Sequence, residues 1–168
     1  MIPTLYTERL TLRPYQRSDF DTYAAFMGSP QSVHMGGPFD AEQAWAWFTN
    51  DIATWPLYGF GTLAVEFQGT CIGGVGMVYP PHFPEPECGW MIFEGFTGKG
   101  FAQEAGRRML DHTFATTDLA SIVSYVSVEN TASIKVATNL GGTLDPVAAK
   151  ADGDGEDTYV FRHVRRAA

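Results

Sequence analysis

The segment from Trp90 to Ala105 contains the residues with the clearest chemical potential in this 168-residue chain. A short apolar run leads into a loop with Gly98 and Gly100, and this loop passes directly into a predicted helix. At such a junction several backbone N–H groups lack helical partners, and the positive end of the helix dipole lies behind them. The arrangement predicts a site for a phosphate or pyrophosphate group, and therefore a phosphate-bearing cofactor.

Two common phosphate-binding loops fit this segment poorly. In a P-loop, Ser or Thr follows the Gly-Lys pair and reaches a magnesium ion, whereas Lys99 is followed here by Gly100. The dinucleotide fingerprint has glycine at its first, third and sixth positions, and the sixth position here is Gln103. A dinucleotide-binding oxidoreductase is therefore only a distant alternative.

The string Gly-Lys-Gly-Phe-Ala-Gln-Glu-Ala at residues 98–105 resembles the pyrophosphate loop of the GNAT acetyltransferases, in the branch similar to ribosomal-protein N-terminal acetyltransferases. The family pattern is Arg or Gln, two residues, Gly, one residue, and then Gly or Ala. Gly100 and Ala102 occupy its key positions, and Thr97 departs from its first one. Further motifs of this branch occur in the expected order at Thr7–Pro14, Glu87–Trp90, Asn130–Ser133 and Leu140–Gly142. The resemblance covers nearly the whole chain and implies a single GNAT domain over residues 1–168.

The resemblance implies an α/β GNAT fold with a mixed, mostly antiparallel sheet of about seven strands, splayed between its fourth and fifth strands, and about four helices. Alternation of apolar and polar residues predicts a strand at 9–13. Residues 60–67 and 70–79 are expected to form a hairpin that turns at Gln68-Gly69, and further strands are expected at 121–128 and 158–164. Asp40 is expected to cap a helix that ends before Pro56. In the helix after the glycine loop, Glu104 and Arg108 are expected to pair on the exposed face.

Acetyl-CoA is the cofactor that the resemblance implies. In the family its pantetheine arm pairs with the exposed edge of the fourth strand, which assigns Met91, Ile92 and Phe93 to the arm. A backbone N–H near Ile92 is the expected oxyanion donor. Asn130 is expected to cap a short helix, either alone or while also binding the pantetheine amide. The residues assigned to the pyrophosphate are Gly98, Lys99, Gly100, Phe101, Ala102 and Gln103.

Direct transfer of an acetyl group inside a ternary complex needs no enzyme nucleophile. Besides the donor to the carbonyl oxygen, the chemistry requires a base that keeps the amine neutral and an acid that protonates the leaving thiolate. Many GNAT enzymes protonate the leaving thiolate with a tyrosine seven residues after the asparagine of the last motif, where this chain has Ala137. In the branch that it resembles, the acid is the serine three residues after this asparagine, which is Ser133 here. The alternative is a serine in the first turn of a helix that hydrogen-bonds only locally.

Glu87 is the candidate base, because a carboxylate at the start of the fourth strand can take a proton from an ammonium group through water. A surface carboxylate at a strand end is an equally consistent interpretation. Glu66 and Glu94 are weaker candidates for the same role.

Three tryptophans and one glycine-containing segment are candidates for the acceptor site, because the first two helices and their connection often line it in the family. The tryptophans are Trp45, Trp47 and Trp55, and the segment runs from Val33 to Pro38. The alternative interpretations are aromatic core residues and a surface turn.

The composition is that of an ordinary globular chain, with 45% hydrophobic and 18% charged residues. With 11 basic and 19 acidic residues the net charge is −8, which argues against a nucleic-acid partner and mildly favours a cationic acceptor such as an amine. The 4 histidines show no metal-ligand spacing, and the 2 cysteines predict no disulfide framework. The sequence shows no signal peptide and no run of ~20 apolar residues, so we expect a cytoplasmic protein without a membrane partner, as a monomer or homodimer.

Together these patterns predict an acetyl-CoA-dependent N-acetyltransferase that acts on a primary amine, either a protein N-terminus or a small amine. A non-catalytic module that binds acetyl-CoA is the main alternative, since the usual tyrosine is absent and the base is not assigned.

Overall fold

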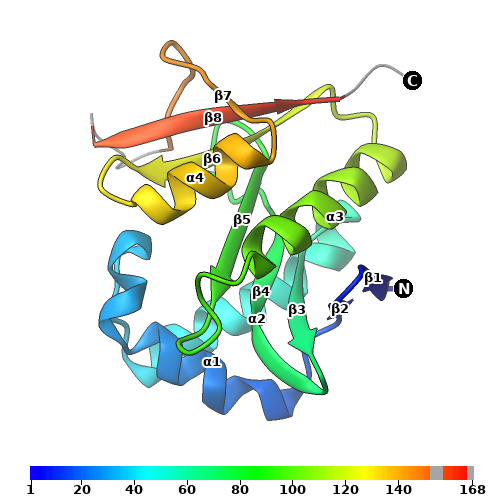
Figure 1. Cartoon of the computed structure of the whole chain (residues 1–168), viewed down its shortest axis with the longest axis vertical. Helices are drawn as coiled ribbons and strands as arrows, with labels where there is room; N and C mark the ends of the chain where they lie inside the picture. The colour runs from blue at the N-terminus through cyan, green and yellow to red at the C-terminus, as the bar shows by residue number, and fades with distance from the viewer. Residues whose placement is uncertain (152–156, 166–168) are drawn as a thin grey trace.

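The central strands are apolar and buried in continuous runs, and helices with apolar residues at helical spacing cover the sheet. The computed structural model describes residues 1–151 and 157–165. Its strands are β1 (Leu5–Tyr6), β2 (Thr11–Arg13), β3 (Thr62–Phe67), β4 (Thr70–Val78), β5 (Glu87–Ile92), β6 (Ser121–Ser127), β7 (Thr143–Leu144) and β8 (Thr158–Val164). Its helices are η1 (Arg17–Asp19), α1 (Phe20–Met27), η2 (Pro30–Met35), α2 (Ala41–Tyr58), α3 (Phe101–Thr116) and α4 (Thr131–Asn139). Figure 1 shows α3 and α4 in front of the strands, α2 behind them and α1 at the bottom of the view.

The eight strands form one mixed sheet in the order β1-β2-β3-β4-β5-β6-β8-β7. Neighbouring strands are antiparallel except β5 and β6, which run parallel and pair only at Glu87 and Val123. The prediction did not include the short β1, so its fourth and fifth strands are β5 and β6 of the structure. The expected splay between them is confirmed, because they pair at a single position. The prediction of about seven strands omitted β1, whose 2 residues are too few to show an alternation.

Helix α2 begins where the sequence predicts and ends later. The side chain of Asp40 accepts a hydrogen bond from the backbone N–H of Gln43 at 2.8 Å, and the side chain of Gln43 accepts one from the N–H of Asp40. The predicted end before Pro56 is wrong, because the helix continues to Tyr58 with this proline inside its last turn. The helix instead ends at Gly59, which has a φ of 76° and donates its N–H to the carbonyl of Trp55.

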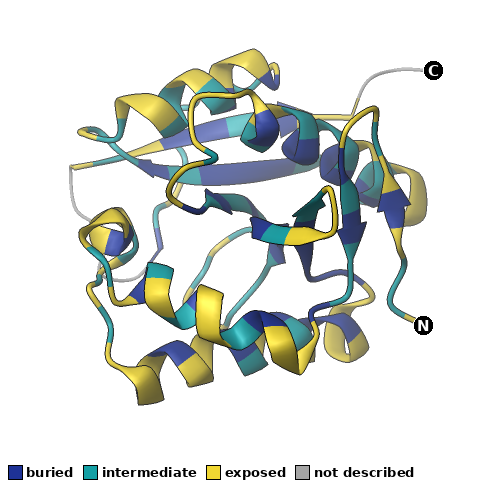
Figure 2. Cartoon of the chain, turned by 60° about the horizontal axis from the view of Figure 1, so that its bottom comes forward, coloured by how far each residue is buried: buried dark blue, intermediate teal, exposed yellow. Residues whose placement is uncertain are grey.

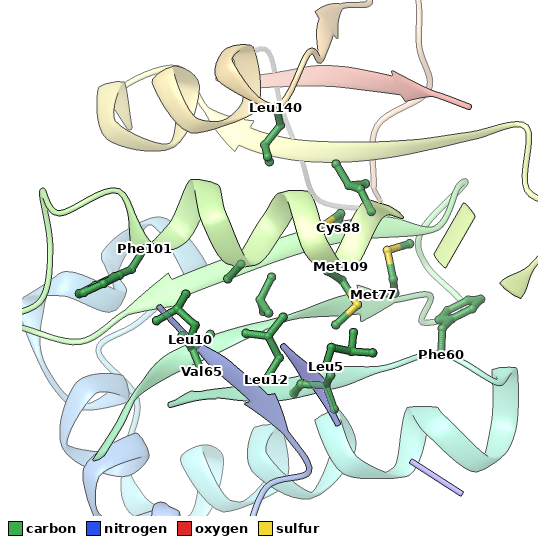
Figure 3. Packing of buried hydrophobic residues seen from close by; sticks show 14 of the residues in the cluster. Leu5, Leu10, Leu12, Phe60, Val65, Met77, Cys88, Phe101, Met109 and Leu140 are labelled. Carbon is green, nitrogen blue, oxygen red and sulfur yellow. The ribbon is translucent and has the colours of Figure 1, made fainter. Parts of the chain in front are cut away.

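The main core lies between α3 and the sheet. Phe101, Ala105 and Met109 on one face of α3 are buried against side chains from the strands. Figure 3 shows Phe101 and Met109 of this helix beside strand residues of the cluster. The strand and loop residues labelled there are Leu5, Leu10, Leu12, Phe60, Val65, Met77 and Cys88. This packing fixes the helix whose first turn follows the glycine loop.

A second core lies between the sheet and the helices α1 and α2. Tyr23 and Phe48 form an edge-to-face aromatic pair at 5.2 Å between ring centroids, and Met91 of β5 belongs to the same cluster. In Figure 2 the sheet is largely buried, whereas the outer faces of the helices are exposed. The two cores leave β5 held between α3 on one face and the pair α1 and α2 on the other.

Candidate active site

The sheet opens where β5 and β6 diverge after their single pair at Glu87 and Val123 (Figure 1). Phe93 donates its backbone N–H to the carbonyl of Ile72 on β4 at 2.8 Å. Successive N–H groups along a strand point to opposite edges, so the N–H of Ile92 points away from β4 and toward the opening. This orientation is the one that the predicted oxyanion donor requires.

A cavity of about 460 Å³ lies at this opening, and residues of β4, β5, β6, α2, η2 and α4 line it. Four of the predicted site residues meet there, namely Glu87, Met91, Asn130 and Ser133. The side chains of Ile92 and Phe93 do not line it, since Ile92 is half-buried against the main core and Phe93 packs on Phe26.

Ser133 is held by two neighbours in the first turn of α4. The side chain of Asn130 caps the helix by accepting a hydrogen bond from the backbone N–H of Ser133 at 3.0 Å. The indole Nε1 of Trp90 donates to the hydroxyl oxygen of Ser133 at 3.3 Å. The hydroxyl is thereby used as an acceptor, and its own proton stays available to donate. The sequence motif Glu87–Trp90 includes Trp90 but did not predict its hydrogen bond to Ser133.

Glu87 lines the cavity at the far end of β5 from Met91. One oxygen of its carboxylate, Oε1, accepts a hydrogen bond from the backbone N–H of Tyr125 on β6 at 3.3 Å. Four residues of extended strand separate Glu87 from Met91, which corresponds to ~13 Å at ~3.3 Å per residue. A proton that moves from an amine near Met91 to Glu87 therefore has to travel through water.

The glycine loop leads into α3 with its backbone exposed. Gly98 and Gly100 have positive φ angles of 74° and 79°, a conformation that glycine adopts without strain. Within the described part of the chain, no side chain caps α3 at Gly100. The N–H groups of the first helical turn are therefore left for a ligand, and an uncapped helix N-terminus fits a pyrophosphate group.

The side chains of the loop residues have separate roles. Lys99 turns back on its own loop, where its ammonium group donates to the carbonyl of Gly95 at 2.9 Å. Phe101 is buried in the main core, so only its backbone can serve the site. The half-buried Ala102 lies in the first turn of α3, and the side chain of Gln103 accepts a hydrogen bond from the amide of Asn139 at 3.0 Å.

A charged clamp that the sequence analysis missed holds the loop from the N-terminal side. The guanidinium of Arg9 donates to the carbonyl of Lys99 at 3.0 Å and forms an ion pair with Glu104 at 2.7 Å. Glu104 also accepts hydrogen bonds from the hydroxyl of Thr7 and the backbone N–H of Arg9. Burial opposes ionisation of Glu104, but these hydrogen bonds outweigh it and lower its pKa. The predicted pair of Glu104 with Arg108 is wrong, because the carboxylate is used by this clamp.

Asp51 of α2 is a cavity residue that the sequence analysis did not select. Its side chain is almost fully buried, and it accepts hydrogen bonds from the hydroxyls of Tyr23 and Thr62, each at 3.1 Å. Burial raises the pKa of this carboxyl to about 7, although both hydrogen bonds act in the opposite direction. A signal was present, since Asp51 falls on the same helical face as the apolar residues Ala44, Phe48 and Trp55.

Only part of the predicted acceptor site lines the cavity. Of the three tryptophans, Trp47 lines it, whereas Trp45 packs on Phe20 and the indole of Trp55 donates to the carbonyl of Thr62. The segment from Val33 to Pro38 begins within the short helix η2, and its residues His34, Met35 and Gly36 line the cavity.

Comparison with known proteins agrees with this geometry. The family profile described as "Acetyltransferase (GNAT) domain" matches residues 9–143. The chain belongs to the GNAT acetyltransferase family. It is 31% identical to the uncharacterized N-acetyltransferase p20 of Bacillus licheniformis, over 97% of each protein. The GNAT family uses acetyl-CoA, and the assignment of this chain as an acetyltransferase follows from the family.

Two solved structures place the GNAT fold of this chain among known ones. An acetyltransferase from Agrobacterium tumefaciens superposes with a TM-score of 0.93 at 44% identity, over 98% of this chain and 96% of that one. RimL, a ribosomal alpha-N-protein acetyltransferase in complex with coenzyme A, superposes with a TM-score of 0.78 at 18% identity, over 96% of this chain and 98% of that one. The second likeness supports the fold alone.

No helix among residues 1–151 and 157–165 is long and apolar enough to cross a membrane. In the same ranges, no group of three or more His, Cys, Asp or Glu side chains is placed to hold a metal ion.

Proposed function

We propose that this protein transfers the acetyl group of acetyl-CoA to a primary amine by direct attack in a ternary complex. The observation that carries the proposal is the meeting of Met91, Asn130 and Ser133 in one cavity, at the opening between β5 and β6. The uncapped N-terminus of α3 supports the same proposal, because it offers N–H groups to a pyrophosphate.

The residues of the chain would then divide the work. When bound, acetyl-CoA supplies the thioester that carries the acetyl group. The N–H of Ile92 stabilises the negative charge that develops on the carbonyl oxygen. The hydroxyl of Ser133 donates its proton to the departing thiolate, and Trp90 keeps the oxygen of this hydroxyl oriented.

Glu87 is the proposed proton acceptor for the attacking amine. Its position ~13 Å along β5 from Met91 requires a relay of water molecules in the cavity. The backbone N–H of Tyr125 holds one carboxylate oxygen and so fixes the position of the side chain. Replacement of Glu87 by Gln should therefore lower kcat most at low pH, where the fraction of neutral amine is smallest.

The activity is tested by release of free thiol from acetyl-CoA in the presence of a panel of primary amines and N-terminal peptides. We expect turnover with at least one amine, and a rise in melting temperature with acetyl-CoA that NAD and ATP do not produce at equal concentration. Tight binding of acetyl-CoA without turnover on any acceptor would indicate a binding module. A rise in melting temperature with NAD alone would instead support a dinucleotide-binding protein.

A further inference from the structure

The cavity contains a buried carboxyl group that the proposed chemistry does not use. Asp51 is 4% exposed and lines the cavity from α2. Its two partners, Tyr23 and Thr62, are neutral hydroxyl groups. Among residues 1–151 and 157–165, no Lys or Arg forms a hydrogen bond or an ion pair with Asp51. The ionised form of this side chain therefore lacks a positive partner inside the folded chain.

A purely structural role does not explain an acid at this position. Burial of an unpaired carboxylate is costly. Asparagine could hydrogen-bond with both hydroxyls without carrying a charge, accepting from one through its oxygen and donating to the other through its amide nitrogen. A cationic ligand in the cavity would explain why this position carries an acid, because it would pair with the buried carboxylate of Asp51.

The floor of the cavity beside Asp51 lacks side chains because three glycines form it. Gly74 and Gly76 of β4 pair with Met91 and Gly89 of β5, and all four residues line the cavity. A Cβ atom added to Gly89 would meet no other atom within 4 Å, so space is open above this residue. A ligand can therefore lie directly on the backbone at Gly89, whereas Tyr15 and Thr62 occupy the space over Gly74 and Gly76.

A second unpaired polar group lies at the same floor. The hydroxyl of Tyr15 is buried and has no hydrogen-bond partner among the described residues. It lies against Gly74, since a Cβ atom at that glycine would be 2.2 Å from the hydroxyl oxygen. A buried hydroxyl without a partner is uncommon, and here it borders a cavity residue on the face that α2 covers.

The register of the sheet places this end of the cavity level with the expected reaction centre. Gly74 is the direct partner of Met91, one residue before Ile92, whose N–H is the proposed oxyanion donor. Glu87 is four residues away on the same strand, at ~13 Å. Asp51 lies level with the middle of β5, because its hydrogen-bond partner Thr62 is the direct partner of Gly76. Gly76 in turn pairs with Gly89, which is two residues from Met91 and two from Glu87.

We propose that Asp51 binds the ammonium group of the acceptor, and that the acceptor is a primary amine with an apolar or aromatic body and no anionic group. This inference rests on the proposed acetyl transfer to an amine. The lining of the cavity supports the class of acceptor, because among the described residues it contains two carboxyl groups, Asp51 and Glu87, and no Lys or Arg; its basic side chains are His34 and His82. Its larger apolar members are Met35, Trp47, Phe83, Trp90, Met91 and Tyr125.

The ion pair would also orient the acceptor. An ammonium group held by the carboxylate of Asp51 has its carbon chain directed away from α2, toward the aromatic side chains of the cavity. After deprotonation the neutral amine stays beside the carboxylate, in the cavity that Met91 also lines. Asp51 would thus select a positively charged acceptor and hold it in place, while Glu87 takes the proton through water.

The test compares wild type with Asp51→Asn, using phenethylamine as the cationic probe. We expect KM for phenethylamine to rise about 10- to 100-fold in the variant, with kcat changed less than about threefold, because a hydrogen bond to a charged group is lost from binding. In the wild type, phenylalanine, which adds a carboxylate beside the amine, should be a much poorer acceptor than phenethylamine. Asp118→Asn, which removes an exposed negative charge far from the cavity lining, is the matched control and should behave as wild type.

Calorimetry separates this inference from the proposed activity. Phenethylamine is titrated into the wild type and into Asp51→Asn, both saturated with coenzyme A, and its affinity should be about 10- to 100-fold weaker for the variant. Phenethyl alcohol, which has no charge, should bind both proteins with equal affinity. Absence of thiol release from any amine would overturn the proposed function and leave this binding result to stand by itself. Equal affinity of the two proteins for phenethylamine, or a fall in kcat at unchanged KM, would refute the assignment of Asp51.

Discussion

Replacement of Asp51 by asparagine should make the folded protein more stable above pH 7 while it weakens acceptor binding. The perturbation is small in shape, because the amide has nearly the size of the carboxyl group and can hydrogen-bond with Tyr23 and Thr62. What changes is the charge. The variant removes the cost of keeping an ionised group in a buried position.

The magnitude follows from the pKa of Asp51, which folding raises from 3.8 to about 7 because the group is buried. Near pH 4 and below, the carboxyl group is largely protonated in the folded chain and increasingly so in the unfolded chain, so wild type and variant should differ little. As the pH rises from 4 to 7 the unfolded chain ionises while the folded chain keeps its proton, and wild type loses stability. Since one pKa unit corresponds to about 1.4 kcal/mol, this loss amounts to at most about 4 kcal/mol above pH 7.

The assay is urea unfolding of wild type and Asp51→Asn at a series of pH values between 4 and 8.5. The difference in free energy of unfolding should grow across this window by about 2–4 kcal/mol in favour of the variant, and its melting temperature at pH 8 should be higher by roughly 5–15 °C. The control Asp118→Asn removes an exposed charge and should show a flat difference. A flat difference for Asp51→Asn as well would refute the reasoning, since it would mean that folding does not perturb this carboxyl group.

Three further substitutions test the cofactor loop and the proposed acid. Gly100→Val should abolish acetyl-CoA binding in calorimetry, because a branched side chain blocks the approach of the ligand to the loop backbone. The control is Gly69→Val in the β3–β4 turn, where glycine has the same φ of 79°. It introduces equal backbone strain and should leave acetyl-CoA binding normal. Ser133→Ala should lower kcat and kcat/KM together by about 10²-fold at unchanged acetyl-CoA affinity. The control Thr138→Ala, on the same helix, should leave both constants unchanged. Weaker acetyl-CoA binding at constant kcat would show that Ser133 is a cofactor contact and not the acid. Glu104→Gln should raise the dissociation constant of acetyl-CoA by roughly 10-fold, because it loosens the guanidinium that holds the loop; unchanged affinity would show that the loop keeps its shape without the clamp.

The parts of the site that could be predicted from the sequence are those fixed by local backbone chemistry. The turn at Gly98 and Gly100 and the helix cap at Asn130 each depend on a few consecutive residues, and both are present in the structure. The splay between β5 and β6 was expected from the family resemblance of these motifs and of their order along the chain. It is present as well.

The residues that were missed depend on contacts between distant parts of the chain. Arg9 and Glu104 are 95 positions apart, and helical spacing alone suggested the nearer Arg108 as the partner. The hydrogen bond from Trp90 to Ser133 joins β5 to α4 across the opening of the sheet. Neither contact leaves a periodic signal in the sequence, because each is decided by which surfaces meet after folding.

Asp51 was missed for a different reason, which also bears on its function. The helical spacing of apolar residues predicts an apolar side chain at this position on the buried face of α2, and an acid departs from that pattern. The uncapped start of α3 and the single pair between β5 and β6 are exceptions of the same kind, since each leaves polar groups without the partners that folding normally provides. Asp51 lines the cavity at the opening between β5 and β6, and β5 continues through the glycine loop into the uncapped α3, so ligands could supply the missing partners at both places. Sites that break the rules of a stable fold are expected to be functional ones, so this coincidence argues that stability has been given up at Asp51 for recognition of a positively charged acceptor.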